Sequence, residues 1–412
     1  MLHPAALARP RQAAMNAAPR PFAGSRPSLA GRTILQIVPR LDAGGAERTT
    51  LDVACAIVQA GGRALVACAG GRMVSELQAL GGVWLPFPAD VKNPLRMLLN
   101  TRRLARLVVD ERVDVLHARS RAPAWVALGA ARMVERPLVT TYHGAYGGGS
   151  KLKLRYNSVM ARGDIVIANS RFTAESILEL YPFASNRLRV IPRGADLTQF
   201  TPGAVDPSRI TALRQSWDVA PDERIVLLAA RLTGWKGQKL LIEAAAKLKR
   251  DGVRFVLAGD PQGRDGYVRE VDRAIEAAGL KGVVKRVGHC KDMPAALLAA
   301  SVLVAPSTEP EAFGRSAVEA QAMGTPVVVS DLGAAPETVL APPEVSPDLR
   351  TGWRAPSGDA DALAEALGQA LALGAAARDA MARRARAHVE QNFSLERMAR
   401  ETLDVYATVL GL

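Results

Sequence analysis

The stretch from Val304 to Val339 constrains the fold most strongly, because it reads as one complete crossover unit of a parallel sheet. It begins with an apolar run, passes through an acidic loop, continues as a helical pattern from Gly314 to Met323 and returns to an apolar run at Val327 to Val329. Strands joined through a helix lie parallel, and helices cover both faces of such sheets. The stretch therefore predicts an α/β fold.

Two carboxylates, Glu311 and Glu319, stand eight residues apart across the junction of loop and helix. Because a helix rises about 1.5 Å per residue, their backbones lie at most roughly 12 Å apart. That separation suits two ends of one elongated polar ligand better than two acids that share one proton. The alternative interpretation is that both are solvated charges on a helix surface.

The full string, with Phe313 and Gly314 between the two acids, resembles the E-x7-E signature of the retaining family 4 glycosyltransferases of GT-B fold. The resemblance implies that Glu311 contacts the sugar of a nucleotide-diphosphate sugar and that Glu319 contacts its ribose. It also implies that Phe313 and Gly314 lie at the donor site.

A second loop of the same half carries two cations. Arg231 and Lys236, five residues apart, follow an apolar run and precede a helical pattern. Cations in such a position are well placed to bind a diphosphate, although any Arg and Lys can also belong to a solvated loop. The loop resembles the donor-diphosphate loop of the family, with Ala230 in place of a Gly. By the same resemblance His289 lies near the nucleotide base.

In the N-terminal half, the apolar run from Thr33 to Pro39 is followed by Gly44, Gly45 and a helical pattern. A strand, a glycine loop and a helix form an arrangement in which free N–H groups of the helix point at an anion. Two glycines are also compatible with a plain turn. The family has a Gly-Gly pair here, close to the donor phosphate and the acceptor, which implies donor contacts for Gly44 and Gly45.

Two histidines, His117 and His143, each end a short apolar run. This edge of an open α/β sheet is where ligands bind, but a lone histidine can equally be a satisfied structural residue. The segment around His143 resembles the one in which the family places an active-site histidine near the transferred sugar. The predicted catalytic residues are His143, Glu311, Arg231 and Lys236. The predicted acceptor-binding residues are His117, Arg119, Tyr142, Lys151 and Lys153.

The segment from Ile191 to Asp196 also resembles the family, with one departure. Arg193 stands where most relatives have an Asn. The substitution adds a cation near the expected interdomain cleft.

The net charge of +13 lies almost entirely in the N-terminal part of the chain. Residues 1–32 carry +5, residues 33–200 carry +9 and residues 201–412 carry −1. Two basic amphipathic segments, 94–113 and 151–162, contribute to this excess. A basic face predicts an anionic membrane, phosphorylated lipid or nucleic acid as its partner. Codon bias toward Arg, and ordinary crossover helices packed on the sheet, are the alternatives.

The length of 412 residues predicts two domains with tails. The first 32 residues contain five Arg, five Pro and no acid, which predicts a disordered basic tail; a transit peptide is the alternative. We expect an acceptor domain at 33–200, a linker at 201–209, a donor domain at 201–390 and a returning helix at 391–412. No apolar run reaches the roughly 20 residues of a membrane span. The three scattered cysteines indicate a reducing compartment without zinc or disulfides.

Together these features predict two Rossmann-like domains facing across a cleft, with a C-terminal helix that packs back on the first. The expected activity is a retaining glycosyl transfer from a nucleotide-diphosphate sugar, without metal or cofactor, to a lipid-linked or lipopolysaccharide-type acceptor. We expect a cytoplasmic protein with peripheral contact to the inner membrane. A soluble acceptor, or an epimerase, hydrolase or phosphorylase on the same fold, is the alternative. No nucleic-acid recognition motif is recognisable.

Overall fold

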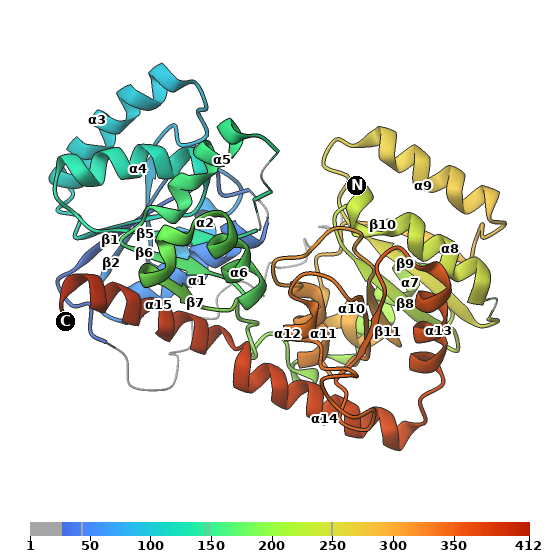
Figure 1. Cartoon of the computed structure of the whole chain (residues 1–412). Coiled ribbons are helices and arrows are strands. Elements are labelled where there is room, and N and C mark those ends of the chain that lie inside the picture. Colours follow the sequence, from blue (N-terminus) through green and yellow to red (C-terminus); the bar gives the residue numbers. More distant parts are fainter. Residues whose placement is uncertain (1–26, 43, 145, 148, 249) are drawn as a thin grey trace, which may run out of the picture.

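A computed structural model describes residues 27–412 except residues 43, 145, 148 and 249, and shows two α/β domains side by side (Figure 1). The first sheet has the order β3-β2-β1-β4-β5-β6-β7 and the second the order β10-β9-β8-β11-β12-β13, with every pair parallel. The predicted α/β architecture with two parallel sheets is confirmed.

The elements of the first domain are β1 (Thr33–Ile37), α1 (Gly45–Gln59), β2 (Arg63–Cys68), α2 (Val74–Ala79), β3 (Val83–Pro86), α3 (Pro94–Asp110), β4 (Val115–Ala118), α4 (Arg121–Met133), β5 (Leu138–Tyr142), α5 (Lys151–Asn157), β6 (Ile165–Ala168), α6 (Arg171–Leu180) and β7 (Leu188–Val190). Short 3-10 helices follow α5 and α6, at Ser158–Ala161 and Pro182–Arg187. In β1 every residue is buried, as expected for a central strand covered on both faces.

The elements of the second domain are α7 (Pro207–Ser216), β8 (Arg224–Ala229), α8 (Gln238–Leu248), β9 (Val253–Ala258), α9 (Asp265–Ala277), β10 (Val284–Gly288), α10 (Met293–Ala299), β11 (Val302–Ala305), α11 (Arg315–Ala322), β12 (Val327–Ser330), α12 (Ala335–Thr338), β13 (Trp353–Ala355), α13 (Ala360–Leu371) and α14 (Ala375–Asn392). Two 3-10 helices lie at Pro202–Ala204 and Gly234–Lys236. The unit β11-α11-β12 is the crossover expected between Val304 and Val329.

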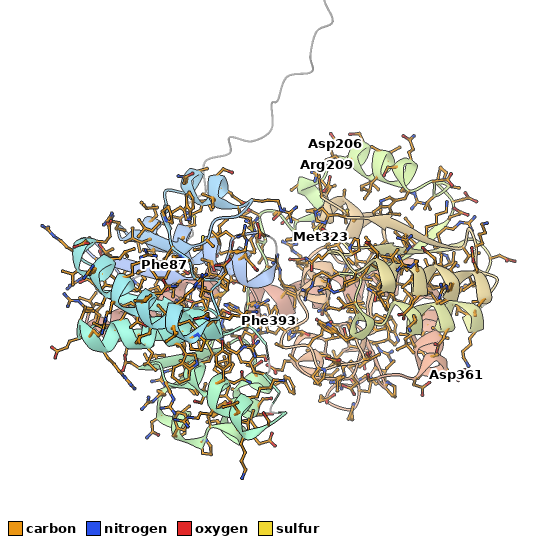
Figure 2. The ribbon with its side chains drawn as sticks, turned by 90° about the horizontal axis from the view of Figure 1, so that it is seen from above. Phe87, Asp206, Arg209, Met323, Asp361 and Phe393 are labelled. Carbon is orange, nitrogen blue, oxygen red and sulfur yellow. The ribbon has the colours of Figure 1, made fainter. Side chains whose placement is uncertain are left out.

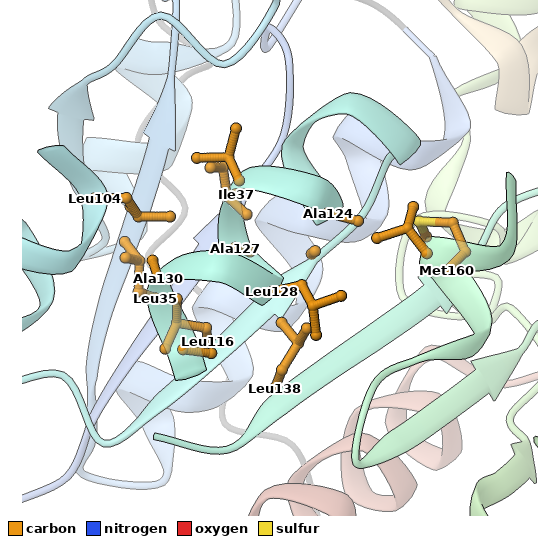
Figure 3. Packing of buried hydrophobic residues seen from close by; sticks show 14 of the residues in the cluster. Leu35, Ile37, Leu104, Leu116, Ala124, Ala127, Leu128, Ala130, Leu138 and Met160 are labelled. Atoms are coloured by element: carbon orange, nitrogen blue, oxygen red, sulfur yellow. The ribbon is translucent and has the colours of Figure 1, made fainter. Parts of the chain in front are cut away.

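The core of the first domain follows from the twofold alternation of its strands. Ile34 faces the cluster that α1 forms on one side of the sheet. Leu35 and Ile37 face the other side, where they pack with Leu104 of α3 and Ala127 of α4 (Figure 3). The sheet is thus buried between two helical layers.

Helix α15 (Leu395–Leu410) returns to the first domain, as predicted. It lies along the lower side of that domain in Figure 1, while α14 lies under the second domain. Met398, Leu403 and Tyr406 are buried in the cluster that contains β1 and α1.

The chain crosses between the domains twice at one place. The Ala195 N–H donates to the Phe393 carbonyl at 2.8 Å, and the Leu395 N–H donates to the Ala195 carbonyl at 2.9 Å. A Cβ on Gly194 would lie 2.3 Å from Leu395 Cα, so only glycine fits this approach. Figure 2 shows Phe393 where the two domains meet. The connection between the domains, which we call the hinge, therefore consists of two adjacent segments, one at Ala195 and one at residues 393–395.

The predicted linker at 201–209 is wrong. Ala195 and Phe200 are already buried in the core of the second domain. Arg209 pairs with Asp292 at 2.7 Å and lies on the second domain in Figure 2. The crossing therefore lies earlier, because the Pro- and Gly-rich residues form surface turns of a domain that has already begun.

The predicted tail is only partly within the described residues, since residues 1–26 lie outside them. Residues 27–32 do not behave as a disordered tail. Leu29 is 0% exposed, and its N–H donates to the Ala60 carbonyl at 2.8 Å. This short segment is part of the first domain.

Helix α3 differs from the expectation in the face it buries. Leu104, Ala105 and Val108 pack on the domain, whereas Leu95 and Leu98, which share an apolar side of the amphipathic pattern with Ala105, are 75% and 59% exposed. No helix in the described part of the chain is long and apolar enough to cross a bilayer.

Candidate active site

The carboxyl ends of strands in both sheets carry the predicted site residues. Gly44 and Gly45 follow β1 and His143 follows β5 in the first domain. Lys236 follows β8 and Glu311 follows β11 in the second. This is the edge at which ligands bind in open parallel sheets.

Lys236 and Glu311 form an ion pair. Lys236 Nζ lies 2.7 Å from Glu311 Oε1, and the two side chains are 15% and 18% exposed. The Ser307 hydroxyl donates to the same carboxylate oxygen. Lys236 Nζ also lies 4.3 Å from the centre of the Trp235 ring, in cation–π geometry. The structure thus brings together two residues that are 75 positions apart in the chain.

Two glycines make this approach of the loops feasible. Gly237 has a φ of +74°, and a Cβ there would lie 1.8 Å from the Pro306 carbonyl oxygen. Gly333 has a φ of +67°, and a Cβ there would lie 2.5 Å from the Glu311 carbonyl oxygen. The backbone of Glu311 is also held by a 2.9 Å hydrogen bond from the Ala334 N–H. Both sides of the acidic loop are therefore fixed by backbone packing.

Arg231 presents a cation without a fixed partner. Its side chain is exposed, and no carboxylate of the described residues lies within ion-pair distance of it. Its carbonyl accepts a hydrogen bond from Gln238 Nε2 at 2.9 Å, which holds the loop. Arg231 is thus free to meet an anion next to the Lys236–Glu311 pair.

Glu319 is buried, with 6% exposure. It forms an ion pair with Arg315, one turn earlier on α11, and the distance from Arg315 Nη2 to Glu319 Oε1 is 2.6 Å. The interpretation of Glu311 and Glu319 as solvated surface charges is therefore wrong, since each carboxylate is largely buried and paired.

Phe313 does not face a donor site through its ring. It is 4% exposed and packs edge-on against Phe393, with ring centres 5.6 Å apart. The donor contact predicted for this side chain is corrected: its apolar ring belongs to the core. Gly314 has a φ of +83° and is the N-cap of α11. His289 is exposed directly after β10, at the same edge of the sheet.

On the first domain, Arg193 joins the glycine loop to His143. Arg193 Nη2 lies 2.9 Å from His143 Nδ1 and donates to the His143 carbonyl at 3.3 Å. A Cβ on Gly45 would lie 2.4 Å from Arg193 Nη1. Burial first, and then the charge of Arg193, hold the pKa of His143 well below its usual value. His143 is thus a neutral ring beside a cation.

Three of the predicted acceptor contacts are corrected. His117 is fully buried, and its ring nitrogens bond Tyr406 Oη at 2.6 Å and Thr141 Oγ1 at 2.7 Å. Arg119 is 2% exposed and donates through Nε to Gln36. In the apolar runs of the sequence these side chains could not be told from ligand contacts, because their partners are distant in the chain.

Tyr142 is also buried, with 2% exposure, and packs at 5.2 Å on the Tyr146 ring. Burial raises the pKa of its hydroxyl. Lys151 and Lys153, by contrast, are exposed on α5.

Two functional candidates were missed in the sequence. Ser307 lies two residues after the end of β11, at the carboxyl edge of the sheet, and that position is the signal that could have identified it. Glu337 lies on α12, and its two carboxylate oxygens accept the N–H groups of Arg171 and Phe172 at 2.8 and 2.7 Å. Glu337 thus caps α6 of the other domain, a contact for which the sequence holds no local sign.

Both halves of the chain match glycosyltransferase families. Residues 43–199 match the profile of Glycosyltransferase Family 4, and residues 209–388 match Glycosyl transferases group 1. A D-inositol 3-phosphate glycosyltransferase of Xylanimonas cellulosilytica is 34% identical over 60% of this chain and 58% of the relative. Its counterpart from Nocardia farcinica is 36% identical over 42% of this chain and 39% of the relative. The chain spans about half the length of these curated relatives, or less.

Solved structures extend the likeness to nearly the whole chain. A glycosyltransferase from Rickettsia africae is 32% identical with a TM-score of 0.84, covering 92% of this chain and 98% of that one. Anabaena HepE in complex with UDP and glucose is 26% identical with a TM-score of 0.80, covering 92% and 100%. With two parallel-sheet domains of GT-B architecture, this chain belongs to glycosyltransferase family 4.

Proposed function

We propose that this protein is a retaining glycosyltransferase that moves a sugar from a nucleotide-diphosphate sugar to an acceptor. The observation that carries the proposal is the Lys236–Glu311 pair, 2.7 Å apart, with Arg231 unpaired in the same loop as the lysine. A bound diphosphate would form ion pairs with both Arg231 and Lys236. Because Lys236 would then no longer pair with Glu311, that carboxylate could accept hydrogen bonds from the sugar hydroxyls.

The donor class is supported by relatives. Anabaena HepE has been crystallised with UDP and with UDP-glucose. In our proposal Glu319, oriented by Arg315, accepts the ribose hydroxyls, and Gly44 and Gly45 lie close to the phosphates. Backbone groups of Gly314 and the side chain of His289 complete the donor contacts.

The chemistry depends on charge stabilisation of the leaving group. As the sugar departs, negative charge grows on the diphosphate, and preorganised cations stabilise it most strongly at that point. We propose that Arg231 and Lys236 supply this stabilisation without a metal. The acceptor hydroxyl then attacks the face that the leaving phosphate vacates and passes its proton to that phosphate, which retains the anomeric configuration. The anomer of the product, measured by NMR, tests this step.

A donor screen tests the proposal. Binding of the correct nucleotide sugar should raise the melting temperature by mass action. Glu311→Gln keeps the size of the side chain but removes its charge, and we expect nucleotide release to fall about 100-fold. Glu309→Gln, an exposed acid of the same loop, is the matched control. Full turnover by the Glu311 variant would refute this site.

The acceptor side favours a lipid-linked or cell-envelope glycan at an anionic membrane. Leu95, Leu98 and Leu99 of α3 are 75%, 59% and 63% exposed, and Leu152 of α5 is 79% exposed. Exposed arginines and lysines flank them: Arg96, Arg102, Arg103 and Arg106 on α3, Lys151 and Lys153 on α5. Exposed leucines beside cations are the pattern of helices that lie in a membrane interface. Both helices lie at the upper side of the first domain in Figure 1.

We therefore propose peripheral contact with the cytoplasmic face of the inner membrane. Vesicles with anionic lipid should bind the protein, vesicles of neutral lipid should not, and salt should weaken binding through screening. Leu98→Gln with Leu99→Gln should reduce binding; Leu349→Gln, an exposed leucine of the second domain, is the control. Binding that ignores both lipid charge and salt would refute the electrostatic part of this proposal, and no binding to anionic vesicles would favour a soluble acceptor.

A further inference from the structure

Arg193 occupies a position between the glycine loop and the candidate catalytic histidine. Its Nη2 approaches His143 Nδ1 at 2.9 Å, and Nη1 occupies the space that a side chain at Gly45 would need. The same nitrogen, Nη2, also donates to the His143 carbonyl at 3.3 Å. Ring and backbone of His143 are thus held by one guanidinium.

The chemistry of the guanidinium decides the state of the ring. An arginine side chain donates hydrogen bonds and accepts none. Burial lowers the pKa of Arg193 only to about 10, so the group stays charged near neutral pH. His143 Nδ1 must therefore be the acceptor, and the proton of the neutral ring must sit on Nε2. His143 Nε2 is shielded from solvent and has no hydrogen-bond partner among the described residues.

The surroundings of His143 disfavour its protonation. The charged and titratable groups that face it are Arg193, Arg119 and His117, and the Tyr146 hydroxyl meets its backbone. The two arginines carry positive charge, and His117 is itself buried and neutral, with its pKa well below the usual value. No acid is among the groups that act on the ring, so a second proton on His143 finds no compensating charge.

We propose that Arg193 is a positioning residue that fixes His143 as the neutral Nε2–H tautomer, so that the ring offers one hydrogen bond to a hydroxyl oxygen of the transferred sugar. The identity of that oxygen rests on the proposed function; the tautomer does not. An Asn at this position could present either an oxygen or an amide N–H to Nδ1. Arginine removes that choice.

The glycine loop is part of the same device. A Cβ at position 45 would lie 2.4 Å from Nη1, closer than side chains tolerate. Gly45→Ala should therefore displace the guanidinium and release Nδ1. Gly45→Ala, a substitution on α1, would then change the tautomer of His143, which follows β5. If Gly45 served only its own turn, the substitution would leave His143 unchanged.

The test is NMR of the full chain with nitrogen-15 in its histidines, recorded without any donor. His143→Gln identifies the signals of this ring. From about pH 6 to about pH 8, the wild-type ring should keep its proton on Nε2 and should not titrate. In Arg193→Met the ring should mix tautomers and gain a titration, whereas Arg193→Lys, which still donates, should restore the wild-type pattern.

Arg189→Met is the matched control, because this arginine lies exposed on β7, where its Nη1 donates to the neighbouring Leu188 carbonyl at 2.9 Å. It should leave the His143 signals unchanged. A wild-type ring protonated on Nδ1, or an Arg193→Met ring identical to wild type, would overturn the proposal. Circular dichroism of each variant separates unfolding from loss of the contact.

Turnover supplies a second readout with UDP-glucose as the probe. Arg193→Met should lower nucleotide release about 10-fold and add an acidic limb to its pH profile, because the freed ring now protonates. An unchanged pH profile in this variant would count against the inference. If wild-type protein ignores UDP-glucose while the NMR pattern holds, the donor assignment fails and the tautomer assignment stands.

Discussion

In the second domain the buried charges of the site pair with each other, whereas in the first domain buried cations lie without carboxylate partners. Lys236 pairs with Glu311 and Arg315 with Glu319. Arg119 and Arg193 each leave one guanidinium nitrogen without a partner among the described residues. On the side of the second domain, Arg231 is thus the cation that remains unpaired among the described site residues. The first domain retains positive charge at Arg119 and Arg193, and residues 33–200 as a whole carry +9.

The largest effect should come from breaking the pair in the second domain. Lys236→Met removes one of two cations for the diphosphate, and we expect turnover to fall about 100- to 1000-fold. The melting temperature should also fall, because Glu311 is left largely buried without its partner. Adding Glu311→Gln should restore the melting temperature and not the activity. Lys239→Met, which removes an exposed pair with Glu270, is the control.

Asp52 on α1 tests the first domain, because burial raises its pKa to about 7. Since the unfolded carboxyl titrates near pH 4, the folded protein holds its proton more tightly and loses stability as pH rises from about 4 to about 7. Asp52→Asn should then stabilise the protein by up to roughly 4 kcal/mol at about pH 8 and hardly at all at about pH 4. Urea unfolding at both pH values measures the difference. Asp42→Asn, an acid whose pKa is lowered by Arg40, should show no such gain.

Tyr406→Phe tests whether His117 serves structure rather than the acceptor. The change removes a 2.6 Å hydrogen bond and leaves a buried ring nitrogen unpaired. We expect a loss of about 1–2 kcal/mol of stability and an unchanged KM for the acceptor. Thr408→Val, on the exposed side of α15, should be neutral. A raised KM for the acceptor would return His117 to the site.

The smallest effect concerns the contact that joins the two domains. Glu337→Gln weakens a carboxylate that caps α6 with hydrogen bonds of 2.8 and 2.7 Å, a change of about 1 kcal/mol. The domains should then separate more readily, which small-angle scattering and protease sensitivity of the hinge near Ala195 would report. Glu309→Gln is the control. Identical scattering curves would show that the hinge alone sets the arrangement.

The strand-and-helix series, the two halves and the loops with Arg231, Lys236 and Glu311 were predictable because each depends on local periodicity and on turn residues. The burial of His117, Arg119 and Phe313 could not be predicted. The local sequence is the same whether a side chain next to an apolar run contacts a ligand or a distant part of the chain. Leu95 and Leu98 were part of an apolar helical pattern but are exposed. Helical periodicity identifies an apolar face, but tertiary packing decides which face of the helix is buried.

From the sequence alone followed the fold family, the places of the loops with Arg231, Lys236 and Glu311, and the uneven charge, because short-range patterns and charge counts do not depend on tertiary contacts. Only the tertiary structure decided that Lys236 meets Glu311, that Arg193 holds His143, and that the chain crosses at Ala195 rather than at residues 201–209. These are contacts between distant segments, and their partners are chosen by packing and by the satisfaction of buried polar groups.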